Sequence, residues 1–265
     1  CIELNMNTIW VLCDGQLARM TAQAALRRKI SIMVYGTVWP HSPAWQIVWG
    51  KNYIQWAWND AARLREFWDR VDVATIDWEN VPPETLEILE NQSIPTRPGS
   101  QVLRVIQDRM TEKQAAIDAW LRTAKFWKVD SLDDLRSWVE QAGDSILKTR
   151  WGGYDGKGQW RLTKESDLEQ AWEDARWKPL ILEQLVRFKM EASVIVARSP
   201  SGQMVAFDPI ENQHESWILR ASVSPARIDA NVREKMIRQA KDLAEHLGVE
   251  WLLAVEMFVL EGGGI

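Results

Sequence analysis

The residues from Lys148 to Gln159 read KTRWGGYDGKGQ, and this glycine-rich stretch decides how the rest of the chain is interpreted. Its last eight residues contain four glycines and a lysine. Glycine allows backbone N–H groups to approach a polyphosphate closely, and lysine supplies a point charge for phosphate. The flanking residues 145–150 and 159–162 have the pattern of two strands. We therefore expect a loop between two strands that binds phosphate, with Lys148 and Lys157 as its cations.

The alternative interpretation of this stretch is an ordinary β-hairpin whose glycines serve only the turn. A simple hairpin needs about one or two glycines, whereas this loop has four and interleaves them with Asp155 and lysine. The stretch is not a Walker loop, because no Gly-Lys-Ser/Thr sequence follows and no helical pattern begins there. The composition therefore favours phosphate binding.

The start of the chain has an apolar run, a glycine turn, a helical pattern and a second apolar run. The two runs are Thr8–Cys13 and Ile30–Tyr35. This order predicts a βαβ unit of the dinucleotide-binding kind, with a helix N-terminus after the turn that suits an anion. Residues 71–76 predict a further buried parallel strand, with Glu79 just beyond it. Ligands bind at that edge of open α/β sheets, so Glu79 is a candidate binding residue, and the alternative for the neighbouring Asn80 is that it caps the next helix.

A connection rich in proline and glycine, residues 93–100, divides the chain into two expected domains of an α/β protein. The first, residues 1–98, is expected to be Rossmann-like, and the second covers residues 99–265. Further helices are expected at 60–70, 100–120, 131–141, 167–176 and 228–247, with Ser131 as the N-cap of the third. Further strands are expected at 180–186, 191–197, 204–207 and 251–260.

Carboxylates beside or inside apolar strands are further candidates. Glu183, at the end of a strand, suits a ribose hydroxyl, while the backbone after it offers a donor and an acceptor to an adenine edge; a solvent-facing side chain is the alternative. Glu256 lies within a very apolar strand, where an unpaired carboxylate is costly to bury. Bound Mg²⁺ removes that cost, and so does the alternative, an ion pair with lysine or arginine. His214, a polar residue near apolar strands, is a further candidate for ligand binding, and the alternative is that it serves only the structure.

Composition excludes several function classes. The 265 residues are 46% hydrophobic and 26% charged, which is a globular balance, and a net charge of −5 argues against nucleic-acid binding. No apolar run approaches the ~18 residues of a membrane span, and the first residues lack the pattern of a secretory signal. Two cysteines, Cys1 and Cys13, make no disulfide framework, which fits a reducing cytoplasm. The 17 tryptophans are unusual for this length.

In this order, the segments of the chain resemble those of the ATP-grasp enzymes, and specifically the N5-carboxyaminoimidazole ribonucleotide synthetases of purine biosynthesis. The resemblance covers nearly the whole chain, and the stretch Gly152–Gln159 is its most specific part. The segments that carry it are 15–20 (GQLARM), 79–82 (ENVP), 107–109 (QDR) with Lys113, 147–150 (LKTR), 152–159 (GGYDGKGQ), Glu183, 191–194 (EASV), 212–214 (NQH) and 255–258 (VEMF).

The resemblance implies an ATP-grasp fold after the Rossmann-like domain, with a lid near residues 112–185. It implies that ATP phosphorylates bicarbonate to carboxyphosphate, with Mg²⁺ or Mn²⁺ as cofactor. The carboxyl group then passes to the 5-amino nitrogen of aminoimidazole ribonucleotide. The implied protein is a cytoplasmic homodimer that binds these small molecules and neither nucleic acid nor membrane.

The resemblance also implies roles for individual residues. The implied ATP contacts are Arg109, Lys148, Gly153, Tyr154, Asp155, Gly156, Lys157, Gly158, Gln159, Glu183, Gln184, Leu185, Val186, Glu191 and His214. The implied catalytic residues are Lys148, Tyr154, Asp155 and Lys157. Glu256 matches a metal-binding carboxylate, and Gln16, Leu17 and Glu79 match positions near the ribonucleotide.

The chain departs from the family pattern where the family has small or basic residues. Cys13 and Asp14 replace a glycine-rich turn, Trp151 replaces an arginine, and Trp217 and Trp251 replace glycines. We expect the family to continue beyond residue 265 with a second metal carboxylate, the rest of the substrate site and a small C-terminal domain.

Three alternatives to this functional interpretation remain. One is a sibling ligase, such as a formate-dependent glycinamide ribonucleotide transformylase or a biotin carboxylase. The others are a non-catalytic nucleotide-binding chain and a heavily substituted chain that retains only the fold.

Overall fold

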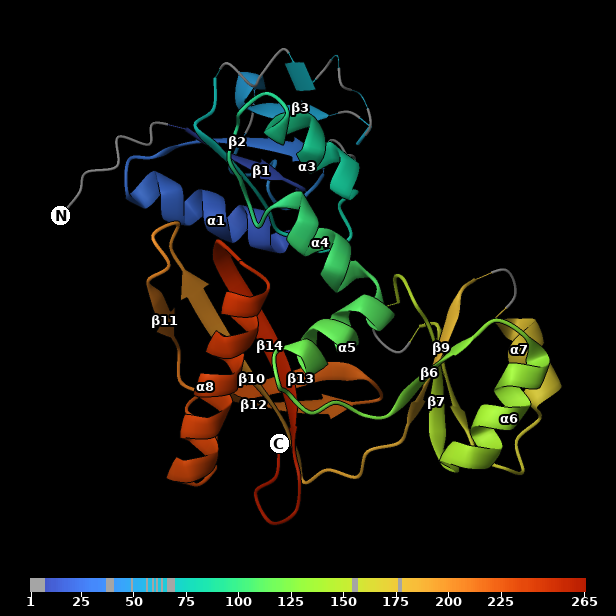
Figure 1. Ribbon diagram of the computed structural model, residues 1–265. Helices are drawn as coiled ribbons and strands as arrows, with labels where there is room; N and C mark the ends of the chain where they lie inside the picture. Colours follow the sequence, from blue (N-terminus) through green and yellow to red (C-terminus); the bar gives the residue numbers. More distant parts are fainter. Residues whose placement is uncertain are drawn as a thin grey trace. The chain divides into compact units, whose positions relative to one another are not determined.

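The computed structural model describes residues 8–36, 41–48, 50–55, 57–58, 60, 62, 64–65, 70–153, 157–175 and 178–265. The chain divides into two compact units, Cys1–Arg104 and Val105–Ile265 (Figure 1). No helix within the described ranges is long and apolar enough to cross a membrane.

The first unit is built on a parallel sheet. Its elements are β1 (Thr8–Leu12), α1 (Gln16–Arg27), β2 (Ser31–Gly36), the 3₁₀ turn η1 (Gly50–Asn52), β3 (Tyr53–Gln55), β4 (Val73–Ile76), α3 (Pro83–Glu90), β5 (Thr96–Arg97) and the start of α4 (Ser100–Gln107). The strand order is β3-β2-β1-β4-β5, and all the pairs are parallel. The predicted βαβ unit and the buried strand beside it are therefore confirmed.

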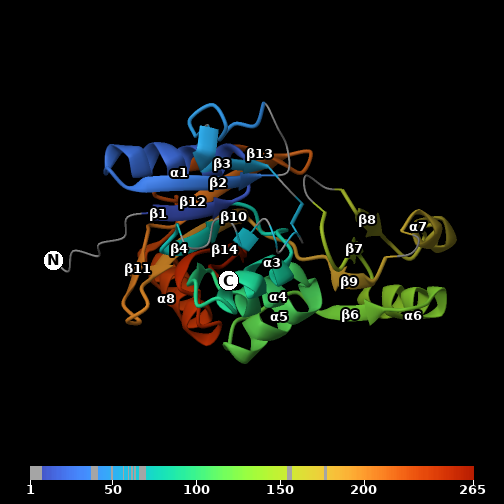
Figure 2. The ribbon, with the colours of Figure 1, turned by 90° about the horizontal axis from the view of Figure 1, so that it is seen from above.

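Helix α1 lies along one face of this sheet (Figure 2). It presents alanines to the strands, because Ala18, Ala22 and Ala25 are buried with Val11 and Val34 of the sheet. Small side chains allow the helix to approach closely, which fixes where its first turn stands relative to the ends of the strands. The helix predicted at 60–70 lies largely outside the described residues.

The second unit contains two antiparallel sheets. Its elements are α5 (Arg109–Asp118), β6 (Phe126–Val129), α6 (Leu132–Ala142), β7 (Ser145–Thr149), β8 (Gln159–Leu162), α7 (Leu168–Asp174), β9 (Leu180–Gln184), β10 (Met190–Arg198), β11 (Met204–Ala206), β12 (Ile210–Glu215), β13 (Ile218–Val223), α8 (Ala230–His246) and β14 (Trp251–Val259). One sheet has the order β6-β9-β7-β8. In the other, β10 pairs with β11, β12 and β14, and β13 pairs with β12.

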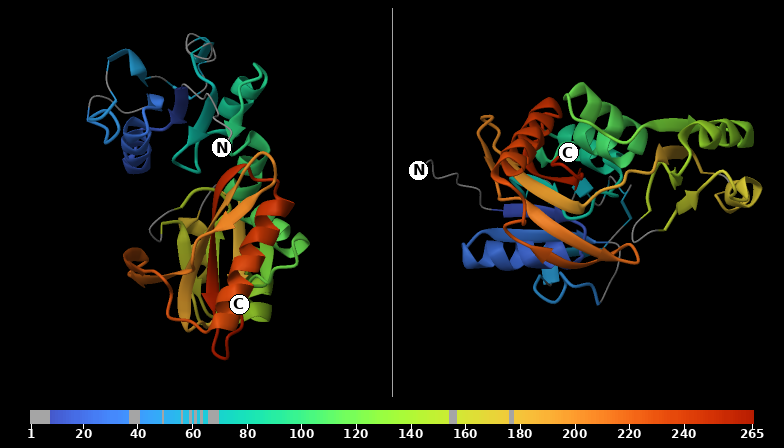
Figure 3. Two further views of the ribbon diagram at one scale, coloured as in Figure 1. Left: turned by 90° about the vertical axis from the view of Figure 1, so that its left-hand side faces the viewer. Right: turned by 90° about the horizontal axis from the view of Figure 1, so that it is seen from below.

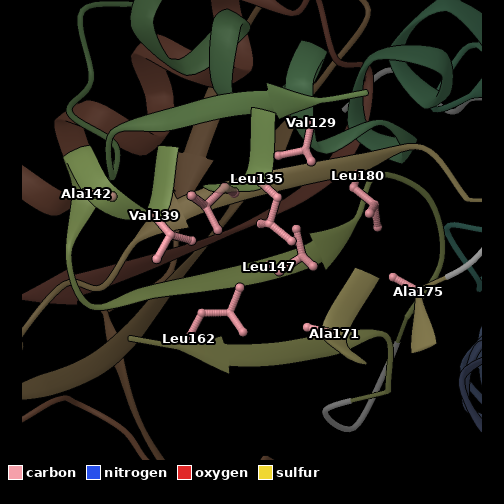
Figure 4. Close-up of a cluster of buried hydrophobic side chains, with 10 residues drawn as sticks. Val129, Leu135, Val139, Ala142, Leu147, Leu162, Ala171, Ala175 and Leu180 are labelled. Carbon is pink, nitrogen blue, oxygen red and sulfur yellow. The ribbon is translucent and has the colours of Figure 1, made fainter. Parts of the chain in front are cut away.

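The smaller sheet packs against α6 and α7 through its own apolar core (Figure 4). Leu147 of β7 and Leu182 of β9 are direct partners across the strands, and both are fully buried in this core. Helix α6 begins as predicted, because the Ser131 hydroxyl accepts a hydrogen bond from the Asp134 N–H at 3.1 Å. The side chains that alternate with these leucines must therefore face away from the helices.

The larger sheet is covered on one face by α8 (Figure 3). Met236, Ala240 and Ala244 of α8 are fully buried against Val194 and Val196 of β10. The side chains that alternate with these valines along β10, and their neighbours on β14, lie on the opposite face of the sheet. The strands β6, β12 and β13 were not predicted, because β12 is rich in polar residues and the turn after it lacks glycine.

Several residues other than glycine have a backbone conformation that favours glycine. Among them, Cys13, Trp217 and Trp251 have φ values of 120°, 68° and 112°. For L-residues this region costs about 1–2 kcal/mol, because Cβ crowds the neighbouring carbonyl. These are positions at which the resemblance leads us to expect glycine, and the positive φ values are those that glycine adopts freely.

The β12–β13 hairpin provides a test of this strain. Its two-residue turn consists of Ser216 and Trp217, whose φ values of 50° and 68° are those of a turn that favours Asn-Gly. Because the Trp217 side chain is 56% exposed, its removal loses little buried area. We expect the double change Ser216→Asn with Trp217→Gly to stabilise the protein by about 1–2 kcal/mol, which thermal unfolding measures as a higher Tm.

The matched control is Trp78→Gly, which removes a similarly exposed indole, 42% accessible, from a residue without a positive φ. It should not raise Tm. An unchanged or lower Tm in the hairpin variant would show that the turn carries no strain.

Candidate functional site

A buried cluster of three charges lies on the face of the smaller sheet that faces away from α6 and α7. Glu183 of β9 accepts on one oxygen, Oε2, from Lys148 Nζ at 3.0 Å and lies 3.2 Å from Lys113 Nζ of α5. The side chains of the two lysines are 17% and 15% exposed, and that of the glutamate is 9% exposed. The cluster therefore has two positive charges and one negative charge in a site largely closed to water.

Register and pleat explain why these side chains meet. Lys148 lies opposite Ile181, two positions before Glu183 on the same strand, so Lys148 and Glu183 share a face. Their chain neighbours Leu147 and Leu182 occupy the apolar core on the other face. A slip of one residue between β7 and β9 would exchange the two faces, so the core fixes the charge cluster.

Together, burial and neighbouring charges lower the pKa values of both Lys148 and Glu183. Burial lowers the pKa of Lys148, with Lys113 and Arg109 acting in the same direction and Glu183 opposing them. Burial alone would raise the pKa of Glu183, but Lys148 and Lys113 more than offset it and lower that pKa. The carboxylate therefore stays ionised at neutral pH, and the excess positive charge remains available to an anion.

The base of the glycine-rich loop is held next to this cluster. The Thr149 N–H donates to Gly158 O at 3.0 Å, which closes the loop between β7 and β8. A Cβ on Gly158, whose φ is +71°, would stand 2.9 Å from Thr149 Oγ1, and a Cβ on Gly153 would stand 2.7 Å from Lys157 O. Glycine is therefore required at both positions by backbone conformation and by space. Tyr154, Asp155 and Gly156, predicted to act here, lie outside the described residues.

Two arginines fix the loop base to the start of α5. Arg109 donates through Nε to Thr149 O at 3.2 Å and through Nη2 to Gly152 O at 3.4 Å. Arg150 binds the buried Asp108 through two nitrogens, with Nε at 3.0 Å from Oδ1, and its guanidinium stacks on the Trp151 ring at 4.5 Å. The sequence interpretation did not anticipate the Asp108–Arg150 pair, which joins residues distant in the chain.

The remaining residues predicted in this sheet are placed as follows. Gln159 is the first residue of β8 and pairs with Lys148, while Lys157 is exposed in the loop. The Gln184 N–H donates to Lys125 O and the Leu185 N–H to Asp144 O, both at 2.9 Å, so these two groups are already used within the protein. The predicted adenine contact must therefore use the backbone carbonyl groups at the end of β9 and the backbone of Val186.

A row of polar side chains crosses the larger sheet on the face opposite α8. Glu256 of β14 lies opposite Ser193 of β10, and the Asn212 side chain links Ser193, at 3.1 Å, to Ser222, at 3.0 Å. A carboxylate oxygen of Glu191, two positions before Ser193, lies 2.5 Å from His214 Nδ1. Glu191, His214 and Glu256 are thus brought to one region of one sheet, as expected of residues that share a ligand.

A metal ion at Glu256 would need ligands from elsewhere. Within the described residues, no three His, Cys, Asp or Glu side chains stand close enough to hold a metal ion together. Mg²⁺ in nucleotide sites is commonly bound by one or two carboxylates and by phosphate oxygens. A single exposed carboxylate on the polar face therefore fits a magnesium ion that arrives with a nucleotide, and does not fit a preformed metal centre.

In the first unit, the predicted residues stand at the carboxyl edge of the parallel sheet. Gln16 and Leu17 are in the first turn of α1, after β1, and Glu79 follows β4, which pairs with β1. The Ala18 N–H of the same turn donates to Asp77 Oδ2 at 2.8 Å, so a carboxylate of the protein occupies the expected anion position. The Asn80 amide donates to Glu79 at 3.0 Å, and the cap of α3 is Pro82, so the alternative of capping by Asn80 is wrong.

The unusual Asp14 is turned into the protein. Its Oδ2 accepts from the Tyr53 hydroxyl at 2.5 Å, and the residue is 7% exposed. A Cβ on Gly36 would stand 2.3 Å from this oxygen, so the glycine makes room for the carboxylate. Burial and a hydrogen bond with Asp77 raise the pKa of the adjacent Cys13 to about 12, so this thiol is not a nucleophile at neutral pH.

Comparisons with known proteins agree with this architecture. A family model described as the ATP-grasp domain matches residues 114–265, and one described as the ribonucleotide synthetase preATP-grasp domain matches residues 6–107. The N5-carboxyaminoimidazole ribonucleotide synthase of Brucella melitensis is 36% identical over 97% of this chain and 71% of its own length. Another such synthase is covered over 66% of its length, so the chain spans about two thirds of these relatives.

Solved structures give the same result. The ADP complex of an N5-carboxyaminoimidazole ribonucleotide synthetase has a TM-score of 0.91 at 37% identity, covering 97% of this chain and 67% of the other. The synthase of Aspergillus clavatus, in complex with ADP and 5-aminoimidazole ribonucleotide, has a TM-score of 0.89 at 25% identity, covering 98% and 68%. The fold class expected from the sequence is confirmed. The chain belongs to the N5-carboxyaminoimidazole ribonucleotide synthase family of ATP-grasp proteins.

Proposed function

We propose that the chain forms the nucleotide-binding part of an enzyme that carboxylates 5-aminoimidazole ribonucleotide at its 5-amino nitrogen, using ATP and bicarbonate. The proposal rests chiefly on the buried pair of Lys148 and Glu183 beside the base of the glycine-rich loop. That loop holds the sequence most specific to the family. An ADP complex and a complex with ADP and aminoimidazole ribonucleotide among the relatives support the same substrates here.

The proposed reaction has two steps, phosphorylation of bicarbonate and transfer of the carboxyl group. A bicarbonate oxygen attacks the γ-phosphorus of ATP, and the bond to the β-phosphate oxygen breaks, so ADP leaves and carboxyphosphate forms. The 5-amino nitrogen then attacks the carboxyl carbon, phosphate leaves, and the nitrogen loses a proton. Phosphoryl transfer needs charge neutralisation and positioning more than covalent help. Lys148 and Arg109 supply positive charge, and backbone N–H groups of the loop from Gly153 to Gln159 contact the phosphates.

The loop also excludes water in this proposal. Carboxyphosphate is labile, and closing a site over such an intermediate prevents its hydrolysis. Tyr154, Asp155 and Lys157 complete the predicted catalytic set.

The other ligand contacts in this proposal come from the family resemblance. Glu183 to Val186 flank the base and ribose, and Glu191 and His214 contact the nucleotide from the larger sheet. Glu256 holds Mg²⁺ or Mn²⁺ together with phosphate oxygens, and that ion would neutralise charge on the transferred phosphoryl group. Gln16, Leu17 and Glu79 bind the ribonucleotide through its polar groups, since Asp77 already accepts from the Ala18 N–H in the first turn of α1. The active protein is a cytoplasmic homodimer.

The full-length protein tests this proposal through ADP release. We expect release of ADP only when bicarbonate and aminoimidazole ribonucleotide are both added with Mg-ATP, measured in a coupled assay. Stimulation by formate and glycinamide ribonucleotide, or by biotin, would assign a sibling ligase instead. Tight ATP binding without ADP release would identify a non-catalytic nucleotide-binding protein.

Replacing Lys148 tests the charge at the centre of the site. Lys148→Met keeps the length of the side chain and leaves Glu183 paired with Lys113. We expect kcat/KM for ATP to fall by about 100-fold or more, as for the loss of one charged group that contacts the transition state. Lys128→Met is the control, because Lys128 is an exposed lysine of the same sheet that pairs with Asp130. An activity loss shared by both variants would contradict the specific role.

Gly158→Ala tests the loop base. An added Cβ would meet Thr149 Oγ1 at 2.9 Å in a backbone conformation that side chains rarely adopt. We expect affinity for Mg-ADP, measured by calorimetry, to fall by about tenfold or more. Gly202→Ala is the matched control, because Gly202 has a similar φ of +83° but only the end of an arginine side chain nearby, at 3.8 Å. Equal losses in the two variants would refute a special role for the loop.

A further inference from the structure

Lys113 occupies a position that the proposed contacts with ATP do not explain. Its Nζ lies 3.2 Å from Glu183 Oε2, the same oxygen that binds Lys148, and donates to Thr123 Oγ1 at 3.1 Å. The Nζ also stands 5.9 Å from the centre of the Phe126 ring. Three neighbours from three different segments therefore fix this ammonium, whereas an exposed lysine samples many rotamers.

One carboxylate oxygen shared by two ammonium groups is an unusual arrangement for stability alone. A buried ion pair balances its charge with one lysine, and a second lysine adds like-charge repulsion in a site with little water to screen it. The surroundings contain further charge, because Arg109 and Glu112 also act on this cluster. The second lysine therefore needs a reason beyond packing.

We propose that Lys113 is a positioning residue of the nucleotide site: it shares the Glu183 carboxylate with Lys148, and so holds the Lys148 ammonium in place while leaving its charge for the phosphates of a nucleoside triphosphate. This inference rests on the proposed nucleotide site. With both lysines present, neither neutralises Glu183 alone, and the cluster presents one net positive charge to the ligand. Lys113 reaches the phosphates only through its effect on Lys148.

The consequences of removing Lys113 follow from electrostatics. Glu183 would pair with Lys148 alone, so the pair would be neutral and the Lys148 ammonium would be drawn toward the carboxylate. The like charge of Lys113 would also be gone, so the pKa of Lys148 would rise. This rise reports that the two ammonium groups are coupled, whereas the loss of Mg-ADP affinity through Glu183 separates positioning from packing.

The test uses the full-length protein with Lys113→Met, Lys113→Gln and Lys113→Arg, and Lys128→Met as the control. Two quantities are measured: the Kd for Mg-ADP by calorimetry, and the pKa of Lys148 without nucleotide, by NMR of ¹³C-methylated lysines assigned with Lys148→Arg. We expect the Met and Gln variants to bind Mg-ADP about tenfold more weakly. We expect their Lys148 pKa to rise by about 0.5–1 unit. The Arg variant and the control should remain within about threefold of wild type.

A double variant separates positioning from packing. Because the loss in Lys113→Met acts through Glu183, the same change made in a Glu183→Gln background should lower the affinity by less than the tenfold seen with Glu183 present. Strictly additive losses, with an unchanged or lower Lys148 pKa, overturn the inference. Failure of the wild-type protein to bind Mg-ADP would instead reject the nucleotide site, whereas normal wild-type binding with unaltered Lys113 variants rejects only the role of Lys113.

Discussion

The Glu183 carboxylate, shared by Lys148 and Lys113, is the interaction on which the candidate site depends. It is possible only because β7 and β9 pair in one register, with leucines in the core under α6 and α7 and charged side chains on the other face. Burial of the apolar core thus offsets the free-energy cost of ordering these charged side chains and removing them from water. The same strand β7 leads directly into the glycine-rich loop, so one register sets the places of both the cation and the loop base.

Several residues that have a Cβ adopt a backbone conformation that suits glycine. Among them, Cys13, Trp217 and Trp251 have positive φ values, and the resemblance leads us to expect glycine there. Trp151 differs from these three, because it stacks on the Arg150 guanidinium that holds the loop base. Strain of about 1–2 kcal/mol at each of three positions is large against the total stability of a domain. The tryptophan excess therefore has consequences chiefly for stability at the turns, and at Trp151 for the loop.

Local features could be predicted from the sequence, and contacts between distant segments could not. The βαβ unit and the Ser131 cap depend on patterns within a few residues, and both are confirmed. The strands β12 and β13 were missed because strained Ser216 and Trp217 form a turn that has no turn signal. Lys113 and Glu183 are 70 positions apart, and Asp77 meets Ala18 across 59 positions, so no spacing rule could join them. The roles of the predicted site residues stay predictions until a ligand is seen.

The sharpest test of the charge cluster is a crystal structure of the full-length protein with Mg²⁺ and a non-hydrolysable ATP analogue. We expect phosphate oxygens within hydrogen-bond distance of Lys148 Nζ and of the loop N–H groups between Gly153 and Gln159, with Glu183 still shared by both lysines. A nucleotide bound away from Lys148, or a Glu183 carboxylate that no longer contacts either lysine, would contradict this arrangement.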